Sequence, residues 1–339
     1  MAEPVPSPIH GIGVTTLHLV DAERHDPWEP SARRELVVTV HYPAARADSY
    51  PPADRILPGL APARARLGAP TDAATASLPV LLYSPAMSLP AGASSMLAEE
   101  LADQGYVVVS VGDTHGAFPG TFFPDGHVEL YDPRNATSPA ADVMRISSEA
   151  RAGDIEFVLD ELTAMQRDRG EQLPDGVAAA MDLDRVGMYG HSLGGTMTLY
   201  ADERIRAGVD LDGYAEPADL DPDLTVAPDR PLLFLFGDWS DSGVRRNSVD
   251  LMSAGRTGWT RELLLTGAGH WTFSDLKGLP AHVANTPALS SLLGAIDPQR
   301  AHTVVATYVS AMFDRFLRNR PTPILDAPDP GFPEVEFVR

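Results

Sequence analysis

Short apolar runs alternate with helical patterns over most of the chain. A continuous apolar run of about four to eight residues is typical of a strand buried on both faces of a sheet, whereas apolar residues three and four positions apart are typical of an amphipathic helix. Buried strands are predicted at residues 78–84, 106–113, 184–190, 207–213, 231–238 and 261–269. Helices are predicted at residues 94–105, 145–165, 194–203 and 301–317.

The chain before residue 78 follows a different pattern. An apolar run at 15–20 and the alternation of apolar and polar residues at 36–42 predict two early strands that pair as a hairpin. Strands that alternate with helices form a mostly parallel sheet covered by helices on both faces. An antiparallel N-terminal hairpin followed by such a sheet predicts an α/β-hydrolase type of fold.

The domain organisation follows from where this regular pattern begins and ends. We predict a single α/β domain at 14–320, preceded by an N-terminal arm at 1–13 and followed by a C-terminal tail at 321–339. The segments 43–77 and 114–142 interrupt the pattern, and we expect them to run over the surface as excursions.

Composition and charge exclude several classes of function. The 339 residues, of which 44% are apolar, suffice for a large core. A net charge of −21 argues against a nucleic-acid partner and against docking on anionic lipid. No apolar run is long enough for a membrane span. The chain has no cysteine, which excludes disulfides, thiolate metal sites and cysteine nucleophiles. The start shows no signal-peptide pattern, so the location is cytoplasmic as written, or secreted if a leader was removed.

The stretch RVGMYGHSLGG, residues 185–195, carries the first candidate chemistry. Gly190, Ser192 and Gly194 fit the G-x-S-x-G elbow, in which a serine stands on a sharp turn between a strand and a helix. The glycines leave room for that turn because they lack Cβ atoms. We therefore predict Ser192 as a nucleophile.

A serine hydroxyl needs a base that accepts its proton. His270 follows an apolar strand and two glycines in LLLTGAGHWTFSD, and it lies downstream of Ser192, as the Ser–acid–His order of this fold requires. We predict His270 as the base. His191 lies inside the elbow, where its ring is expected to point away from the serine hydroxyl.

The acid that orients the base is harder to choose. The usual hydrolase arrangement takes it from the later of the two predicted strands between nucleophile and base, whereas Asp212 stands nearest the end of the earlier one. The residue chemistry alone leaves both strands open. The candidates are Asp210, Asp212, Asp238 and Asp241.

The ordered set of motifs resembles the platelet-activating-factor acetylhydrolase family of the plasma and intracellular type II kind, especially its bacterial members. The resemblance extends from about residue 12 to residue 317. It rests on LVDAERHDPW, RELVVTVHYPA, LPVLLYSPAMS, LADQGYVVVSVGDTHGA, FPDGHV, RAGDIEFVLDEL, DRVGMYGHSLGG, VDLDGY and GAGHWTFSD. The elbow occurs in many hydrolases, so the whole series is more specific than any one motif.

The resemblance implies roles that the residues alone leave open. The family takes its acid after the earlier strand, which implies Asp212 as the acid and leaves Asp238 and Asp241 as alternatives. It also implies an oxyanion hole made by the backbone N–H groups of Leu193 and Met87. Relatives commonly carry glycine where this chain has Ala86, so the turn at Met87 departs from the family pattern.

The resemblance implies a serine ester hydrolase that acts on lipid-like or short-acyl esters. Candidate pocket residues are Phe118, Phe122, Phe123, His191 and Trp271. Alternatives with the same three residues are a polyester hydrolase of the cutinase kind, a lactonase and an acyltransferase. An alternative of another class is a non-catalytic binding protein on the same scaffold. We expect no cofactor. We also expect no metal, because the acidic stretch 218–225 lacks the glycine and closing glutamate of an EF-hand. A monomer or small homo-oligomer is expected.

Overall fold

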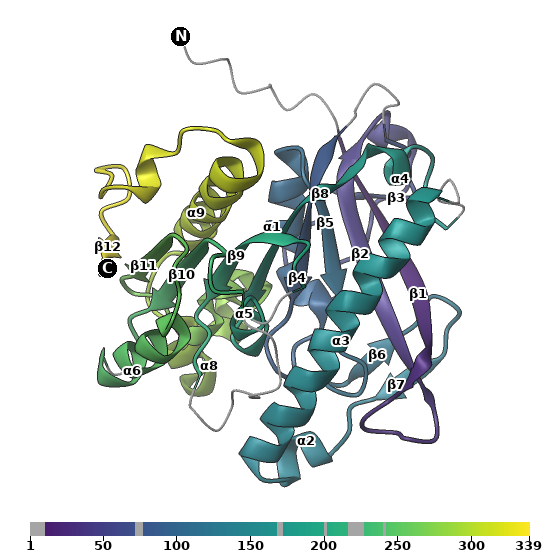
Figure 1. Ribbon diagram of the computed structural model, residues 1–339, viewed down its shortest axis with the longest axis horizontal. Coiled ribbons are helices and arrows are strands. Elements are labelled where there is room, and N and C mark those ends of the chain that lie inside the picture. The colour runs from purple at the N-terminus through teal and green to yellow at the C-terminus, as the bar shows by residue number, and fades with distance from the viewer. Residues whose placement is uncertain (1–10, 72–76, 168–171, 200–201, 216–226, 240–241) are drawn as a thin grey trace.

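The computed structural model describes residues 11–71, 77–167, 172–199, 202–215, 227–239 and 242–339 (Figure 1). Its main sheet has the strand order β12-β11-β10-β9-β8-β4-β5-β2-β1-β3 in the described part of the chain. The strands are β1 (Gly11–His25), β2 (Arg33–Ala44), β3 (Arg66–Leu67), β4 (Leu78–Ser84), β5 (Val107–Val111), β8 (Met181–His191), β9 (Ile205–Leu211), β10 (Leu232–Gly237), β11 (Thr260–Leu265) and β12 (Val335–Phe337).

The strand directions match the predicted class of sheet. Strands β5, β4, β8, β9, β10 and β11 pair in parallel along the sheet. Strand β2 pairs antiparallel with both β1 and β5, so the N-terminal hairpin joins the parallel section at β5. The predicted α/β-hydrolase fold is thus confirmed.

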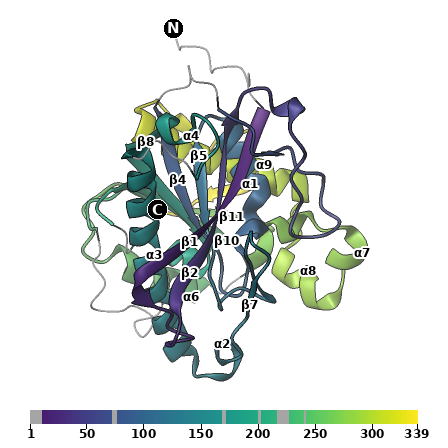
Figure 2. The same cartoon turned by 90° about the vertical axis from the view of Figure 1, so that its right-hand side faces the viewer.

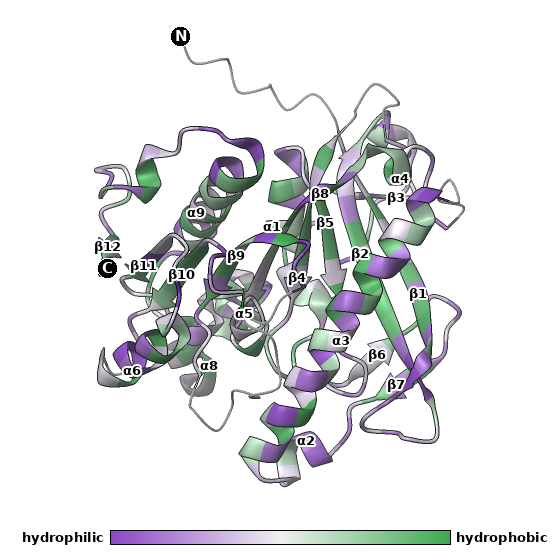
Figure 3. Cartoon of the chain, in the orientation of Figure 1, coloured by the Kyte–Doolittle hydropathy of each residue, from purple (hydrophilic) through white to green (hydrophobic). Residues whose placement is uncertain are grey.

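Helices cover both faces of this sheet because its central strands are apolar on both sides (Figures 2 and 3). Helix α3 (Ala140–Arg167) lies on one face and shares a core with α6 (Ser242–Ser253). Helices α1 (Ser95–Asp103) and α9 (Pro298–Arg318) lie on the other face and share the second large core. In Figure 2 the strands are seen between α3 on one side and α1 and α9 on the other.

Several elements differ from the sequence-based prediction. The helix after the elbow, predicted over 194–203, is the short α5 (Leu193–Thr196). The predicted arm and tail also differ, because β1 begins at Gly11 and β12 pairs antiparallel with β11. Pairing of this kind depends on contacts between distant segments, which local periodicity does not report.

The excursion at 114–142 is largely ordered as small elements beside the N-terminal hairpin. Strands β6 (Gly120–Phe122) and β7 (Val128–Leu130) form a two-stranded sheet, followed by α2 (Arg134–Thr137). The remaining short helices are α4 (Val177–Ala180), α7 (Ala281–Ala284) and α8 (Pro287–Leu293), with 3-10 turns at 47–49, 91–94, 270–273, 275–278 and 323–325. Among the described helices, none is both long and apolar enough to cross a bilayer.

Candidate active site

Ser192 stands on a strained turn between β8 and α5. Its backbone has φ 56° and ψ −125°, a conformation that costs a non-glycine residue energy and is held by the surrounding structure. A Cβ at Gly190 would lie 2.0 Å from the Gly194 carbonyl oxygen, and one at Gly194 would lie 2.0 Å from the Ser84 carbonyl oxygen. The elbow therefore needs glycine at both positions.

His270 begins the 3-10 turn that follows β11, and it faces the elbow. The Ser192 hydroxyl lies 3.0 Å from His270 Nε2, within hydrogen-bond distance. Two neighbours hold the backbone that carries the imidazole: His191 Nε2–H donates to the His270 carbonyl oxygen at 2.7 Å, and Thr272 Oγ1 donates to the Leu293 carbonyl oxygen at 2.8 Å.

Asp212 lies directly beyond the end of β9 and contacts the other imidazole nitrogen. His270 Nδ1–H donates to Asp212 Oδ2 at 2.5 Å, and Trp239 Nε1–H donates to the same oxygen at 2.7 Å. The other carboxylate oxygen accepts from the Gly237 N–H at 2.8 Å and from the Tyr214 hydroxyl at 3.1 Å. The Asp212 carboxylate is fully buried, and these four contacts supply hydrogen-bond donors to both of its oxygens.

The other acidic candidates occupy different places. Asp210 is fully buried, and desolvation raises its pKa well above the ordinary value, with a further rise caused by the nearby Asp212. Asp238 is exposed and accepts a hydrogen bond from the Gly267 N–H at 2.9 Å, on the loop that leads to His270. Asp241 and the acidic stretch 218–225 both lie outside the described residues.

His191 is fully buried beneath the site. Burial lowers its pKa to about 3, and the neighbouring His270 contributes to the decrease. The ring is therefore neutral near pH 7, and its N–H donates to the His270 backbone. His191 thus holds the backbone of His270 and is not among the described residues that line the cavity beside Ser192.

The turn after β4 lies beside the elbow that carries Ser192, where the second oxyanion donor is expected. Ser88 has a left-handed φ of 63°, whereas Ala86 does not, so an alanine is accommodated without strain at that position. The buried Arg151 of α3 donates to the Pro85 carbonyl oxygen and to Asp113 Oδ2. This ties the turn to the helix below it.

A cavity of about 500 Å³ opens in front of the Ser192 hydroxyl. Its walls are mostly apolar and aromatic, and the described residues that line it are Met87, Met144, Ser192, Leu193, Tyr214, Trp239, Val244 and His270. Trp239 and Tyr214 each follow the end of a strand, in GDWSD and LDGYA, which is the local signal that could have pointed to them. Met144 and Val244 come from α3 and α6 and carry no such signal.

The aromatic residues predicted for this cavity lie elsewhere. Phe118 and Phe122 are exposed, and Phe122 lines a separate cavity beside the N-terminal hairpin. Phe123 is buried against His127, and His191 lies beneath the site. Trp271 belongs to the 3-10 turn of His270 and is not among the described lining residues. For Phe118, Phe122 and Phe123 the prediction is wrong in placement, because the 114–142 segment folds against the N-terminal hairpin. None of the five residues is proposed as a wall of the cavity.

Comparisons with known proteins agree with this fold. No family model matches the chain. Over 281 residues it is 23% identical to a protein of Arthroderma benhamiae described as a probable 1-alkyl-2-acetylglycerophosphocholine esterase, covering 77% of this chain and 66% of that protein. A solved ferulic acid esterase from Streptomyces cinnamoneus superposes with a TM-score of 0.80 at 31% identity, and the match covers 99% of each chain.

The fold and the serine elbow define an α/β-hydrolase. Given 31% identity over 99% of both chains, the protein belongs to the same esterase family of the α/β-hydrolase superfamily as that ferulic acid esterase. The motifs implied an esterase of the α/β-hydrolase superfamily, and these comparisons confirm that class.

Proposed function

We propose that this protein hydrolyses carboxylic esters with an apolar acyl group, using Ser192 as nucleophile, His270 as general base and Asp212 as the acid that orients it. The observation that carries the proposal is the continuous contact from Ser192 Oγ to His270 Nε2, at 3.0 Å, and from His270 Nδ1 to Asp212 Oδ2, at 2.5 Å, at the wall of a cavity. Both esterase relatives support the same reaction class.

The reaction follows from this chain of contacts. Ser192 Oγ attacks the ester carbonyl carbon while its proton passes to His270 Nε2. The carbonyl oxygen becomes an oxyanion, which the backbone N–H groups of Leu193 and Met87 would hold. The C–O bond to the alcohol then breaks, and the alcohol leaves with the proton from His270. Water, deprotonated by the same imidazole, attacks the acyl-serine and releases the carboxylic acid.

The cavity walls favour an aromatic or otherwise apolar acyl group. The rings of Trp239 and Tyr214 form an edge-to-face pair with their centres 5.8 Å apart, and methionine and valine side chains also line the cavity. Aromatic side chains of this kind pack well against a planar aryl group. Among the described lining residues no lysine or arginine is present to pair with a phosphate. We therefore propose a hydroxycinnamoyl-type ester ahead of a phospholipid.

The serine is tested by Ser192→Ala, with Ser290→Ala on the exposed surface of α8 as the matched control. Hydrolysis of p-nitrophenyl butyrate should fall by about 10⁵-fold or more in the first variant, because the nucleophile is lost. A fluorophosphonate probe should label wild type and Ser290→Ala but not Ser192→Ala. Circular dichroism checks that the fold is retained. A wild-type protein that neither reacts with the probe nor turns over esters would instead be a binding protein.

The acyl group is tested by comparing kcat/KM for methyl ferulate, for p-nitrophenyl esters of increasing chain length and for a 1-alkyl-2-acetylglycerophosphocholine. We expect the aryl or medium-chain esters to exceed the phospholipid. The opposite order would favour the lipid-ester alternative while leaving the assignment of Ser192 intact.

A further inference from the structure

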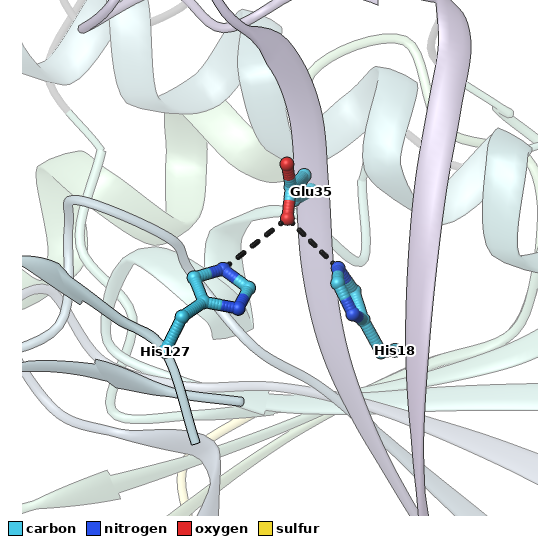
Figure 4. A group of neighbouring side chains, drawn as sticks. All are labelled: His18, Glu35 and His127. Carbon is cyan, nitrogen blue, oxygen red and sulfur yellow. Dashed lines mark hydrogen bonds and ion pairs between the residues drawn. The ribbon is translucent and has the colours of Figure 1, made fainter. Parts of the chain in front are cut away.

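A second group of converging side chains lies between the N-terminal hairpin and the β6–β7 turn (Figure 4). His18 Nε2 lies 2.8 Å from Glu35 Oε2, and His127 Nε2 lies 3.4 Å from the same oxygen. One ligand atom from each of the three residues lies within 4.8 Å of the others. None of the three lines the cavity in front of Ser192 in the described part of the chain.

The three residues meet because the fold brings separate elements together. Val20 of β1 is the register partner of Glu35 in β2. His18 is two residues from Val20, so its side chain lies on the same face of the sheet as Glu35. His127 precedes β7, and the N–H of Phe123 donates to its carbonyl oxygen at 3.0 Å, which closes the turn between β6 and β7. That turn places the His127 imidazole over the hairpin.

The hydrogen bond between His127 and Asp125 leaves the other ring nitrogen of His127 with a lone pair that can bind a metal ion. Asp125 Oδ1 lies 2.7 Å from His127 Nδ1, and an ionised carboxylate only accepts, so Nδ1 carries the proton. In the neutral ring the Nε2 lone pair then points toward Glu35, another acceptor, at 3.4 Å. A cation between these two acceptors, either a proton on His127 or a metal ion, would remove the repulsion between them.

We propose that His18, Glu35 and His127 bind one divalent transition-metal ion of the Zn²⁺ type. Two imidazoles and one carboxylate are a ligand set that suits Zn²⁺, with water at the fourth position. Ligand distances of about 2.0–2.2 Å in tetrahedral geometry separate ligand atoms by roughly 3.3–3.6 Å. The distance from His127 Nε2 to Glu35 Oε2, 3.4 Å, lies within that range. The distance from His18 Nε2 to the same oxygen, 2.8 Å, would have to increase by about 0.5 Å or more.

The surroundings resemble the support that metal ligands receive in known sites. The Asp125 carboxylate holds the non-ligating nitrogen of His127, which orients the ring and raises its basicity. Phe123 stacks on His127 with ring centres 4.0 Å apart and lies 4.6 Å from the His18 ring. The site is thus partly shielded from solvent on the Phe123 side.

An ion at this position would fasten the 114–142 segment to the hairpin. It would also lie at one end of the cavity of about 350 Å³ that Thr16, Val37 and Phe122 help to line. Thr16 and Val37 are the next residues on the same strand faces as His18 and Glu35. The role that follows is stabilisation of this cavity wall, independent of the reaction at Ser192.

The test is calorimetric titration of untagged, chelator-treated protein with Zn²⁺ near pH 7.5, followed by Co²⁺ as a spectroscopic probe. We expect one ion per chain, visible d–d absorption with Co²⁺ and a higher melting temperature with Zn²⁺, because the ion binds the folded state. His18→Ala and His127→Ala should each weaken binding by more than about tenfold, and Asp125→Asn by about tenfold.

His25→Ala is the matched control, since His25 ends the same strand and is exposed. It should leave affinity, stoichiometry and the Co²⁺ spectrum unchanged. If a histidine variant melts at a lower temperature without metal, Glu35→Gln, which keeps the side-chain shape, replaces it in the comparison. Absence of Zn²⁺ binding, or equal binding by His127→Ala and wild type, would overturn the proposal and leave a protonated His127 as the cation between the two acceptors.

Discussion

At the scale of single residues, two residues of the proposed active site are non-glycine residues with a strained backbone. Ser192 and Asp212 both adopt left-handed φ values, 56° and 55°. Such conformations persist only where the surrounding structure enforces them, and they cluster at functional sites. In Asp212 the strain turns the carboxylate back from the end of β9 toward His270, where donors from β10 and the following loop hold it.

The assignment of the acid predicts a contrast between two substitutions. Asp212→Asn should lower kcat/KM for p-nitrophenyl butyrate by about 10³–10⁴-fold, because the amide no longer fixes the reactive tautomer of His270. Asp238→Asn should change it only a few-fold, since Asp238 contacts the loop of His270 rather than its imidazole. A mild Asp212→Asn together with a severe Asp238→Asn would move the acid to the later strand.

Trp239 is expected to position the acid through its indole N–H. Trp239→Phe keeps an aromatic wall but removes the donor 2.7 Å from Asp212 Oδ2. A hydrogen bond to a charged group contributes about 1.5–3 kcal/mol, so kcat should fall by roughly tenfold or more while KM changes little. Trp259→Phe is the control because Trp259 packs against Phe316 of α9, away from the described cavity. Equal kinetics in both variants would assign Trp239 to lining alone.

At the scale of elements, α3 is held to the N-terminal hairpin by buried charges. Asp154 of α3 accepts from Arg34 Nε at 3.1 Å and from Arg34 Nη2 at 2.7 Å, and it also accepts from Arg24 at 2.9 Å. Arg34 is fully buried, and its Nη1 donates to Asp26 at 2.7 Å. The same helix carries Arg151, whose contacts fix the turn after β4. The polar residues of α3 thus link the hairpin to the site.

Breaking this buried network should be costly, whereas a surface pair on the same helix should matter little. Asp154→Asn is expected to lower the free energy of unfolding by about 3–5 kcal/mol, because it leaves a buried guanidinium underpaired. Glu149→Gln, which removes the half-exposed pair with Arg145, should cost no more than about 0.5 kcal/mol. Urea unfolding followed by circular dichroism measures both. Similar losses in the two variants would contradict the role given to burial.

At the scale of the whole molecule, two histidines are buried in the neutral form. Burial lowers the pKa of His41 to about 3 and that of His191 to about 3, from an ordinary value near 6.5. Between these values the unfolded chain binds a proton at each site and the folded chain does not. Stability from this source is therefore complete above about pH 6.5 and is lost as the pH falls toward 3.

This linkage predicts the slope of stability against pH. Between pH 6 and pH 5 the free energy of unfolding should fall by about 1 kcal/mol less in His41→Leu than in the wild type, because unfolding of the variant takes up one proton fewer. His25→Leu, at an exposed position, is the control for replacing a histidine by leucine. Urea titrations at several pH values provide the measurement, and only the slope is compared because the substitution also alters packing. Parallel curves for His41→Leu and wild type would contradict the prediction.

Much of the architecture could be predicted from the sequence because it depends on local patterns. Strand β4 was expected at its observed bounds, and the elbow at Ser192 follows from glycines that a tight turn requires. A helix after the elbow was predicted but not the short length of α5, and the strand β12 was not predicted, since both depend on packing against the rest of the sheet.

The sequence by itself determined the α/β sheet, the serine elbow and the position of His270 after an apolar strand, because each is recorded in neighbouring residues. Only the tertiary structure decided which carboxylate reaches the imidazole, which side chains line the cavity and that His18, Glu35 and His127 converge. Those relations join segments far apart in the chain, and their distances are set by how strands and helices pack rather than by local periodicity.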